Sequence, residues 1–236
     1  MTLDGSEWDV VVVGGGPAGA MAALSAAESH ARTLLIERSE LPRYKLCGGG
    51  LIGTSIRALP PGFEVPAVDS TISATFSLGG HRATTQTATE PIIAMINRSE
   101  FDARLVATAE ASGATIATGV TLEQVDEDDD FALVKTSAGT IRARSLVGAD
   151  GSASRVAGYV GAQYEQVDLG LEVELGVDDE QASEWRGRLH LDFGELPGSY
   201  AWVFPKGDRL TVGAIARRGN GAWQQEYLER FIAGLG

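Results

Sequence analysis

Three glycines follow a run of valines near the start of the chain, and their spacing points to phosphate chemistry. Residues 10–13 are four β-branched apolar residues in a row, which is typical of a parallel strand buried on both faces. Gly14, Gly16 and Gly19 come directly after it. In this pattern Gly14 permits a tight turn, Gly16 lets the backbone approach a pyrophosphate, and Gly19 lets the next helix pack closely on the strand. The stretch is therefore a candidate dinucleotide-binding loop.

A helix over 17–29 and a second strand over 33–36 complete this unit. Pro17 suits the first helical turn because its missing N–H is not needed there, and Ala18 follows it. The free N–H groups and the positive end of the helix dipole then face the phosphates. Glu37, at the end of the second strand, can accept hydrogen bonds from an adenosine ribose and would repel a ribose 2′-phosphate. The pattern predicts FAD or NAD rather than NADP.

Composition and charge exclude several classes of protein. The 236 residues are 44% hydrophobic, which is ordinary for a globular protein, and the formal net charge is −13. That charge argues against nucleic acid and against electrostatic docking on anionic lipid. A single cysteine excludes an intramolecular disulfide, and no metal site is expected. No apolar run reaches the roughly 18 residues of a membrane span, and the N-terminus is acidic where a signal peptide would be basic. We expect a cytoplasmic protein with at most peripheral membrane contact.

Beyond the first unit, the pattern changes from alternating strands and helices to a series of strands. The stretch 42–67 is irregular and long, and loops of that length are usually functional. The acidic run 126–130 is interpreted as a solvated turn. Helices are predicted at 99–112 and 222–233, and strands at 71–78, 81–87, 92–96, 115–118, 121–126, 131–136, 140–148, 169–177, 187–193, 199–205 and 209–216. The last four strands are expected to form an antiparallel meander.

This order predicts a mixed α/β fold, in which a Rossmann-like βαβ domain is interleaved with an antiparallel substrate-binding sheet. The nucleotide-binding domain is expected to comprise 1–68 and 98–160. The sheet is expected to comprise 69–97 and 161–236.

Three further motifs bring a family into view. Asp150 and Gly151 follow a buried strand and open a helix, and they resemble the Asp-Gly motif of FAD-dependent hydroxylases and reductases. The loop at 42–50, Pro-Arg-Tyr-Lys-Leu-Cys-Gly-Gly-Gly, is similar to the loop that geranylgeranyl reductases place against the flavin ring. The strand at 200–205, Tyr-Ala-Trp-Val-Phe-Pro, followed by Gly213, is similar to the substrate-sheet signature of that family. The order of these motifs also matches, so the chain resembles the geranylgeranyl reductase family of FAD-dependent oxidoreductases.

The resemblance implies FAD as cofactor and extends the set of candidate cofactor-binding residues beyond the glycine loop and Glu37. Val120 would lie near the adenine through its backbone, and Arg98 corresponds to a position that contacts the flavin in the wider superfamily. The further residues implied are Arg38, Cys47, Gly48, Gly49, Asp150, Gly151 and Arg155.

Tyr200, Trp202 and Phe204 alternate along one strand, so all three point to one face. On pattern alone an aromatic face is more often ordinary core. The resemblance implies instead that this face lines an apolar tunnel for a prenyl chain. Arg43 and Lys45 could meet a phosphate head group of the substrate.

Cys47 also has two interpretations. A lone cysteine is most often a small buried hydrophobe. Flanked by basic residues and followed by three glycines, it could instead be an exposed, reactive thiol beside the flavin. On that interpretation it is a conceivable catalytic proton donor.

One feature of the family has no counterpart here. Its members carry a second Gly-Asp motif late in the chain, between a strand and a helix, and Gly207-Asp208 lies in a turn between two strands instead. We therefore expect this chain to be the N-terminal part of a longer flavoprotein.

The sequence thus predicts an FAD-dependent oxidoreductase of isoprenoid lipid metabolism that reduces carbon–carbon double bonds of a polyprenyl chain. Electrons could come from NAD(P)H or from a small redox protein. Two alternatives stay open. One is an FAD-dependent aromatic monooxygenase, which shares the first fingerprint and the Asp-Gly motif, and the other is a fragment that folds without retaining flavin.

Overall fold

The computed structural model describes residues 2–235, and the chain forms two compact units. Unit 1 combines the chain up to Tyr44 with Ser99–Gln163, and unit 2 combines Lys45–Arg98 with the chain from Tyr164 on. The expected domain division differs most at residues 45–68, which belong to unit 2, and the other boundaries shift by one to three residues. Within the described residues, no helix has the length and apolar character needed to cross a membrane.

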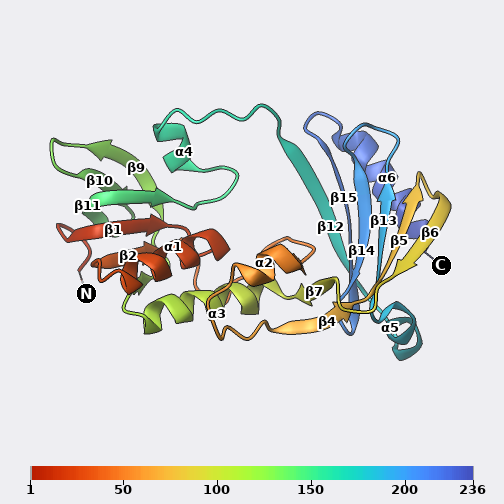
Figure 1. Ribbon diagram of the computed structural model, residues 1–236. Coiled ribbons are helices and arrows are strands. Elements are labelled where there is room, and N and C mark those ends of the chain that lie inside the picture. The colour runs from red at the N-terminus through yellow and green to blue at the C-terminus, as the bar shows by residue number, and fades with distance from the viewer. Residues whose placement is uncertain (1, 236) are drawn as a thin grey trace. The chain divides into compact units, whose positions relative to one another are not determined.

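Unit 1 is built on a six-stranded sheet in the order β8-β2-β1-β11-β10-β9 (Figure 1). The four strands β8, β2, β1 and β11 are parallel to one another, and β10 and β9 extend the sheet in antiparallel fashion. Its elements are β1 (Glu7–Val13), α1 (Pro17–Glu28), β2 (Thr33–Ile36), α3 (Arg98–Ala111), β8 (Thr115–Ala117), β9 (Leu122–Glu127), β10 (Ala132–Thr136), β11 (Gly139–Gly148) and α4 (Arg155–Tyr159).

The core of unit 1 follows from the patterns in its sequence. Val11 and Val12 are fully buried, as a parallel strand covered on both faces requires. Helix α1 packs on β1 and β2 through small residues such as Ala20 and Ala23, which let helix and sheet approach closely. The predicted apolar face of the helix at 99–112 is confirmed, because Phe101, Leu105 and Ala109, all in α3, are buried.

Unit 2 contains a six-stranded sheet in the order β12-β15-β14-β13-β5-β6 and a three-stranded sheet in the order β3-β7-β4. Its elements are β3 (Gly50–Ile52), α2 (Gly53–Arg57), β4 (Ala67–Thr71), β5 (Ser73–Leu78), β6 (His81–Thr87), β7 (Ile93–Ile96), β12 (Asp168–Gly176), α5 (Asp179–Trp185), β13 (Arg188–Phe193), β14 (Tyr200–Pro205), β15 (Arg209–Arg217) and α6 (Gly221–Ala233).

The large sheet of unit 2 corrects the expected meander in two respects. Strand β12 pairs with β15 and not with β13, and helix α5 separates β12 from β13 in the chain. Strand β13 pairs in parallel with β5, so the hairpin β5–β6 joins the same sheet. The stretch 42–67, expected to be irregular, also contains β3 and α2, and the pairing of β3 with β7 explains why it belongs to unit 2.

The two faces of the large sheet are covered differently. Helix α6 packs on one face, where Ala201, Val203 and Val212 are completely buried beneath it (Figure 1). On the opposite face, Phe204 packs with Leu189 and with Met95 of the small sheet. The small sheet therefore covers part of the face that carries the aromatic residues.

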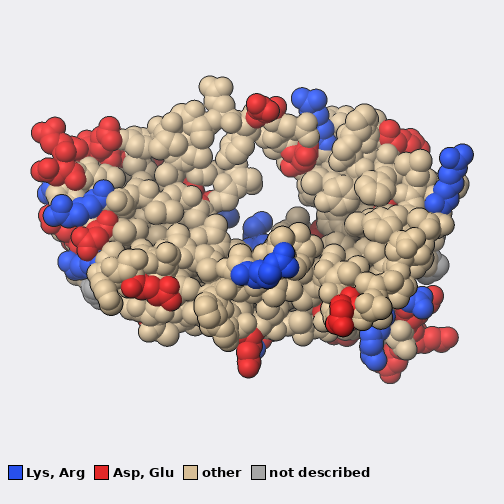
Figure 2. Space-filling view, in the orientation of Figure 1, with Lys and Arg blue, Asp and Glu red and all other residues tan. Residues whose placement is uncertain are grey.

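Acidic side chains gather over the turn between β9 and β10 in unit 1 (Figure 2). The Asp128 carboxylate accepts hydrogen bonds from the backbone N–H groups of Asp130 and Phe131, at 3.0 and 2.8 Å. Asp128, Asp129 and Asp130 are exposed. The solvated turn predicted for 126–130 is confirmed for 128–130, whereas residues 126 and 127 form the end of β9.

Candidate functional site

The glycine loop of unit 1 leaves no room for side chains at two of its predicted positions. Gly14 has a positive φ of 109°, and a Cβ atom there would lie 2.3 Å from the carbonyl oxygen of Ala149. A Cβ atom at Gly19 would lie 1.8 Å from the carbonyl oxygen of Gly14. Both obstacles are backbone atoms, which cannot move aside as a flexible side chain can. The glycines therefore bring the end of β1, the start of α1 and the end of β11 into close contact.

The first turn of α1 is left open toward a ligand. Gly16 is the N-cap residue and supplies no side chain to the helix end, and Pro17 occupies the first helical turn. No acidic residue lies in that turn, and Ala18 is exposed. Because the N–H groups of a helix's first turn need acceptors, this end suits a phosphate.

Glu37 is buried, with 5% of its surface exposed, and organises the loop. Its Oε2 accepts a hydrogen bond from the backbone N–H of Gly15 at 2.7 Å, and its Oε1 accepts one from Ser39 at 3.1 Å. The Arg43 side chain lies 3.5 Å from Oε2. A carboxylate has about four acceptor positions, so Glu37 keeps capacity for ribose hydroxyls. Arg38, the next residue, is exposed.

The structure brings several other predicted cofactor residues to this loop. The Val120 N–H donates to the Glu37 carbonyl at 3.0 Å, which fixes Val120 at the end of β2. Asp150 follows β11, and its carboxylate accepts from the backbone N–H of Arg155 at 2.7 Å and from the Ser154 hydroxyl. Asp150 therefore holds the start of α4.

Gly151 has a positive φ of 86°, and no atom lies within 4 Å of where its Cβ would be. That position is open to a ligand passing along the turn. The Arg155 guanidinium donates to the carbonyl of Glu123 at 3.2 Å. Its predicted contact with the cofactor stays a prediction.

Arg43, predicted to contact substrate, is engaged within unit 1. Its side chain lies 3.2 Å from the buried Asp102 carboxylate as well as beside Glu37. These contacts tie it to the glycine loop and offer no support for a role toward a substrate phosphate. Lys45 is exposed in unit 2, and Arg98 is the first residue of α3. Their predicted roles stay predictions.

The aromatic residues of β14 share one face, as predicted. The Tyr200 and Trp202 ring centroids lie 5.9 Å apart, and those of Trp202 and Phe204 lie 6.3 Å apart. Tyr200 is 36% exposed and Trp202 is 9% exposed, and Phe204 is partly buried and packs against Leu189 and Met95. Packing is thus closest at Trp202 and most open at Tyr200, and the predicted role of this face toward a prenyl chain stays a prediction.

Two glycines lie close against these rings. A Cβ atom at Gly213, the partner of Trp202 across the β14–β15 pair, would lie 2.1 Å from the indole. A Cβ atom at Gly48 would lie 2.7 Å from the Phe204 ring and 3.1 Å from Nε1 of Trp202. The Trp202 indole therefore touches a glycine of the sheet and a glycine of the loop. Its Nε1 is buried without a hydrogen-bond acceptor among the described residues.

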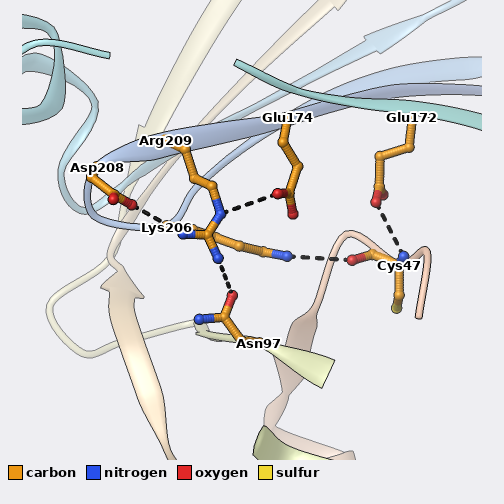
Figure 3. Close-up of polar contacts among 7 residues, drawn as sticks. All are labelled: Cys47, Asn97, Glu172, Glu174, Lys206, Asp208 and Arg209. Carbon is orange, nitrogen blue, oxygen red and sulfur yellow. Dashed lines mark hydrogen bonds and ion pairs between the residues drawn. The ribbon is translucent and has the colours of Figure 1, made fainter. Parts of the chain in front are cut away.

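Cys47 is partly buried, and both its backbone N–H and its carbonyl are hydrogen-bonded (Figure 3). The Cys47 N–H donates to Glu172 Oε1 at 3.1 Å, and its carbonyl accepts from Lys206 Nζ at 3.3 Å. Burial raises the pKa of Glu172 and lowers the pKa of Lys206. Cys47, Gly48 and Gly49 all lie in unit 2 with the aromatic face, and their predicted contact with a flavin stays a prediction.

Glu172 and Lys206 were missed by sequence reasoning. Lys206 is 4% exposed although it adjoins a Gly-Asp turn, where a lysine is ordinarily solvated. Glu172 carried a usable signal, because it alternates with Leu171 and Val173 and so must face the side of β12 opposite to them. That face is the one that carries Trp202, since Glu172 and Trp202 are both paired with Gly213.

The residues of unit 1 fit a dinucleotide. Gly14 and Gly19 form a cradle that a Cβ atom would fill, the uncapped start of α1 offers N–H groups, and Glu37 offers a buried carboxylate. These three features are the ones that a pyrophosphate and a ribose require.

Comparison with known proteins gives the same result. A model of the FAD binding domain family matches residues 7–188. A digeranylgeranylglycerophospholipid reductase of Methanocaldococcus jannaschii is 31% identical over 237 residues, and an uncharacterized protein of Methanosarcina barkeri is 30% identical over 233 residues. These matches cover 95% and 98% of this chain, but 59% of each relative.

A solved structure supports the fold. The geranylgeranyl bacteriochlorophyll reductase-like protein of Thermoplasma acidophilum superposes with a TM-score of 0.80 at 25% identity. The match covers 97% of this chain and 62% of that one. The predicted mixed α/β fold and the predicted resemblance to geranylgeranyl reductases are both confirmed. The chain spans about 60% of the length of these relatives.

Proposed function

Because this chain belongs to the FAD binding domain family, we propose that it is the part of a flavin-dependent reductase that binds FAD and saturates carbon–carbon double bonds of a polyprenyl chain. The observation that carries the proposal is the joint occurrence of two features. Unit 1 has a glycine cradle closed by a buried Glu37, and unit 2 has an aromatic face on which a glycine-rich loop packs. The names of the relatives, prenyl-lipid reductases among them, support the same choice of substrate.

The chemistry divides between cofactor and protein. When bound, reduced FAD supplies a hydride to one alkene carbon, and the second carbon takes a proton. An isolated alkene is a poor hydride acceptor, so a positioned acid must assist. The residues of this chain bind the nucleotide end of the cofactor through Glu37, hold the apolar chain through Tyr200 and Trp202, and exclude water from that face.

The aromatic face fits an apolar chain better than a charged substrate. Tyr200, Trp202 and Ile215 supply apolar surface on neighbouring strands. A flat chain can lie along such a face and gain about 25 cal/mol for each Å² of apolar surface removed from water. Cys47 as proton donor, and NAD(P)H or a small redox protein as electron source, are further parts of the proposal.

The experiment compares two tryptophans on opposite sides of the large sheet. Trp202→Ala removes the indole from the aromatic face and should weaken binding of a geranylgeranyl compound by about 1–3 kcal/mol. Trp223→Ala removes an indole that stacks on Tyr227, 4.9 Å away, on the α6 side. This control should lower stability but leave KM for the prenyl compound unchanged. Equal effects of the two substitutions on KM would contradict the proposed substrate face.

A further inference from the structure

Cys47 is the residue at which the large sheet of unit 2 contacts the glycine-rich loop through polar groups. The two groups that reach it come from different elements: Glu172 from β12 and Lys206 from the turn that follows β14. They lie 125 and 159 residues away from Cys47 in the sequence. One accepts from its N–H and the other donates to its carbonyl, so the residue is held through its backbone from both sides (Figure 3).

Neighbouring contacts leave the loop little freedom. Gly48 packs on Trp202 and Phe204 so closely that a Cβ atom would overlap the Phe204 ring. The Gly49 carbonyl accepts a hydrogen bond from the Ile96 N–H at 2.8 Å. A Cβ atom at Gly49 would lie 2.2 Å from the Ile96 carbonyl oxygen, so this residue also touches backbone.

Glu172 and Lys206, which hold the Cys47 backbone, are both ionisable, and both lie in a buried environment where a charge costs free energy. Lys206 is 4% exposed, and Glu172 Oε2 is buried with no hydrogen-bond partner among the described residues. Burying such groups costs free energy unless they are paired. Glu172 and Lys206 also attract each other electrostatically, which offsets part of that cost.

A second set of polar contacts joins the large sheet to another part of unit 2, and it does not involve Cys47. The Arg209 guanidinium donates to the Asn97 side chain at 2.8 Å and lies 3.4 Å from Glu174 Oε2. Glu174 is on the same strand and the same face as Glu172, two residues along (Figure 3). It therefore provides a matched control for Glu172.

We propose that Glu172 and Lys206 are positioning residues that clamp the Cys47 backbone against the aromatic face and thereby set the orientation of the Cys47 thiol during turnover. The clamp follows from the contacts, whereas its part in the reaction rests on the proposed function.

The experiment uses the thiol itself as the reporter. Cys47 is the single cysteine of the chain, and its alkylation by iodoacetamide can be followed by mass spectrometry of the peptide that contains it. Glu172→Ala and Lys206→Met each remove one clamping bond, and each should raise the alkylation rate about five- to tenfold, the effect of one lost hydrogen bond. Glu172→Gln keeps an oxygen that can accept from the Cys47 N–H and should alkylate at nearly the wild-type rate. Glu174→Ala should do the same.

A purely structural role is excluded by a second readout. All variants are compared well below their melting temperatures, and those that alkylate faster should also show a lower kcat for a geranylgeranyl compound with little change in KM. Unchanged alkylation in both Glu172→Ala and Lys206→Met would overturn the clamp. Faster alkylation with wild-type kcat would overturn its role in positioning. If no variant and no wild-type protein reduces a prenyl compound while alkylation responds as expected, the clamp stands and the proposed function fails.

Discussion

The glycine loop of unit 1 and the aromatic face of unit 2 are both tightly packed, but by different means. In unit 1 the obstacles next to Gly14 and Gly19 are backbone carbonyl oxygens, which would lie 2.3 and 1.8 Å from a Cβ atom at those positions. In unit 2 the obstacles next to Gly48 and Gly213 are the rings of Phe204 and Trp202. Backbone atoms are fixed by the sheet and helix that carry them, whereas a ring can be replaced by a smaller side chain.

This difference has a consequence for mutation. A substitution at Gly14 or Gly19 cannot be compensated by a second substitution, because the nearest obstacle is a backbone carbonyl oxygen. A substitution at the aromatic face can be compensated by reducing the ring that it meets. We therefore expect the largest effect from a substitution that destroys the glycine cradle of unit 1. The smallest effect is expected in unit 2, where a substitution changes only the pH dependence of the melting temperature.

Gly19→Ala should have the largest effect. Its Cβ atom would overlap the Gly14 carbonyl oxygen, so α1 must move away from β1, at a cost of about 3 kcal/mol in the free energy of unfolding. FAD binding should be lost with it. Gly158→Ala, in helix α4, is the control, because nothing lies within 4 Å of its Cβ position. That change should be neutral or stabilising by up to about 1 kcal/mol. Urea denaturation and FAD titration of both variants check the prediction.

Glu37→Ala should weaken FAD binding by about 1–3 kcal/mol, because it removes the ribose acceptor and leaves the Gly15 N–H unpaired. Glu37→Gln keeps one oxygen acceptor but loses the charge that faces Arg43. It should fall between alanine and wild type. Isothermal titration with FAD measures the three affinities, and an alanine variant that binds FAD as tightly as wild type would remove Glu37 from the site.

Gly213→Ala should cost about 1–3 kcal/mol of stability, since its Cβ atom would overlap the Trp202 indole. In a Trp202→Leu background the same change should cost less, by about 1 kcal/mol, because the ring is gone. A double-mutant cycle of unfolding free energies measures the coupling. Strict additivity would show that the indole is not what Gly213 accommodates, and it would weaken the contrast between the two regions.

Cys47 substitutions should have a smaller effect on binding than on turnover. Cys47→Ala should preserve FAD binding and slow alkene reduction or change the number of bonds reduced. Cys47→Leu, which is larger, should also disturb the flavin spectrum through crowding if the thiol lies beside the ring. Absorbance spectra and product analysis test both. Wild-type spectra and turnover in the two variants would identify Cys47 as a packing residue.

The smallest expected effect concerns pH and lies on the α6 side of the large sheet. Burial lowers the pKa of His190 below its usual 6.5, with Asp192 opposing the shift. Ser77 Oγ lies 2.7 Å from His190 Nε2 and also contacts Asp192, which in turn accepts from the Tyr227 hydroxyl at 2.7 Å.

Because the folded pKa of His190 is lowered, its contribution to stability is present above pH 6.5 and is lost as the pH falls through the folded pKa. His190→Gln should therefore flatten the dependence of melting temperature on pH below about pH 6.5. Thermal denaturation from pH 5 to pH 8 measures the slope, and parallel curves for variant and wild type would show that His190 does not contribute.

The sequence predicted unit 1 well because its determinants are local. The strand at 10–13, the glycines and Glu37 lie within one short stretch, and each has a steric or polar reason that holds regardless of the rest of the chain. The burial of Val11, Val12 and Glu37 agrees with that interpretation.

Unit 2 was predicted less completely because its decisive contacts join distant residues. The parallel pairing of β13 with β5 has no local signature, and neither does the contact of Glu172 with Cys47. Arg43 is a further example of contacts that could not be predicted from local sequence. It was predicted to meet a phosphate head group of the substrate, and its contacts with Glu37 and Asp102 had no signal in the sequence.

The most direct test of the proposed function is the product of a single anaerobic turnover. The protein, loaded with FAD and reduced, is mixed with a geranylgeranyl compound, and the flavin absorbance and the mass of the product are recorded. We predict that the flavin reoxidises and that the product is heavier by pairs of hydrogen atoms, while a small aromatic acid has no effect. Oxygen-dependent hydroxylation of the aromatic acid, with the prenyl compound left unchanged, would contradict the reductase and identify a monooxygenase.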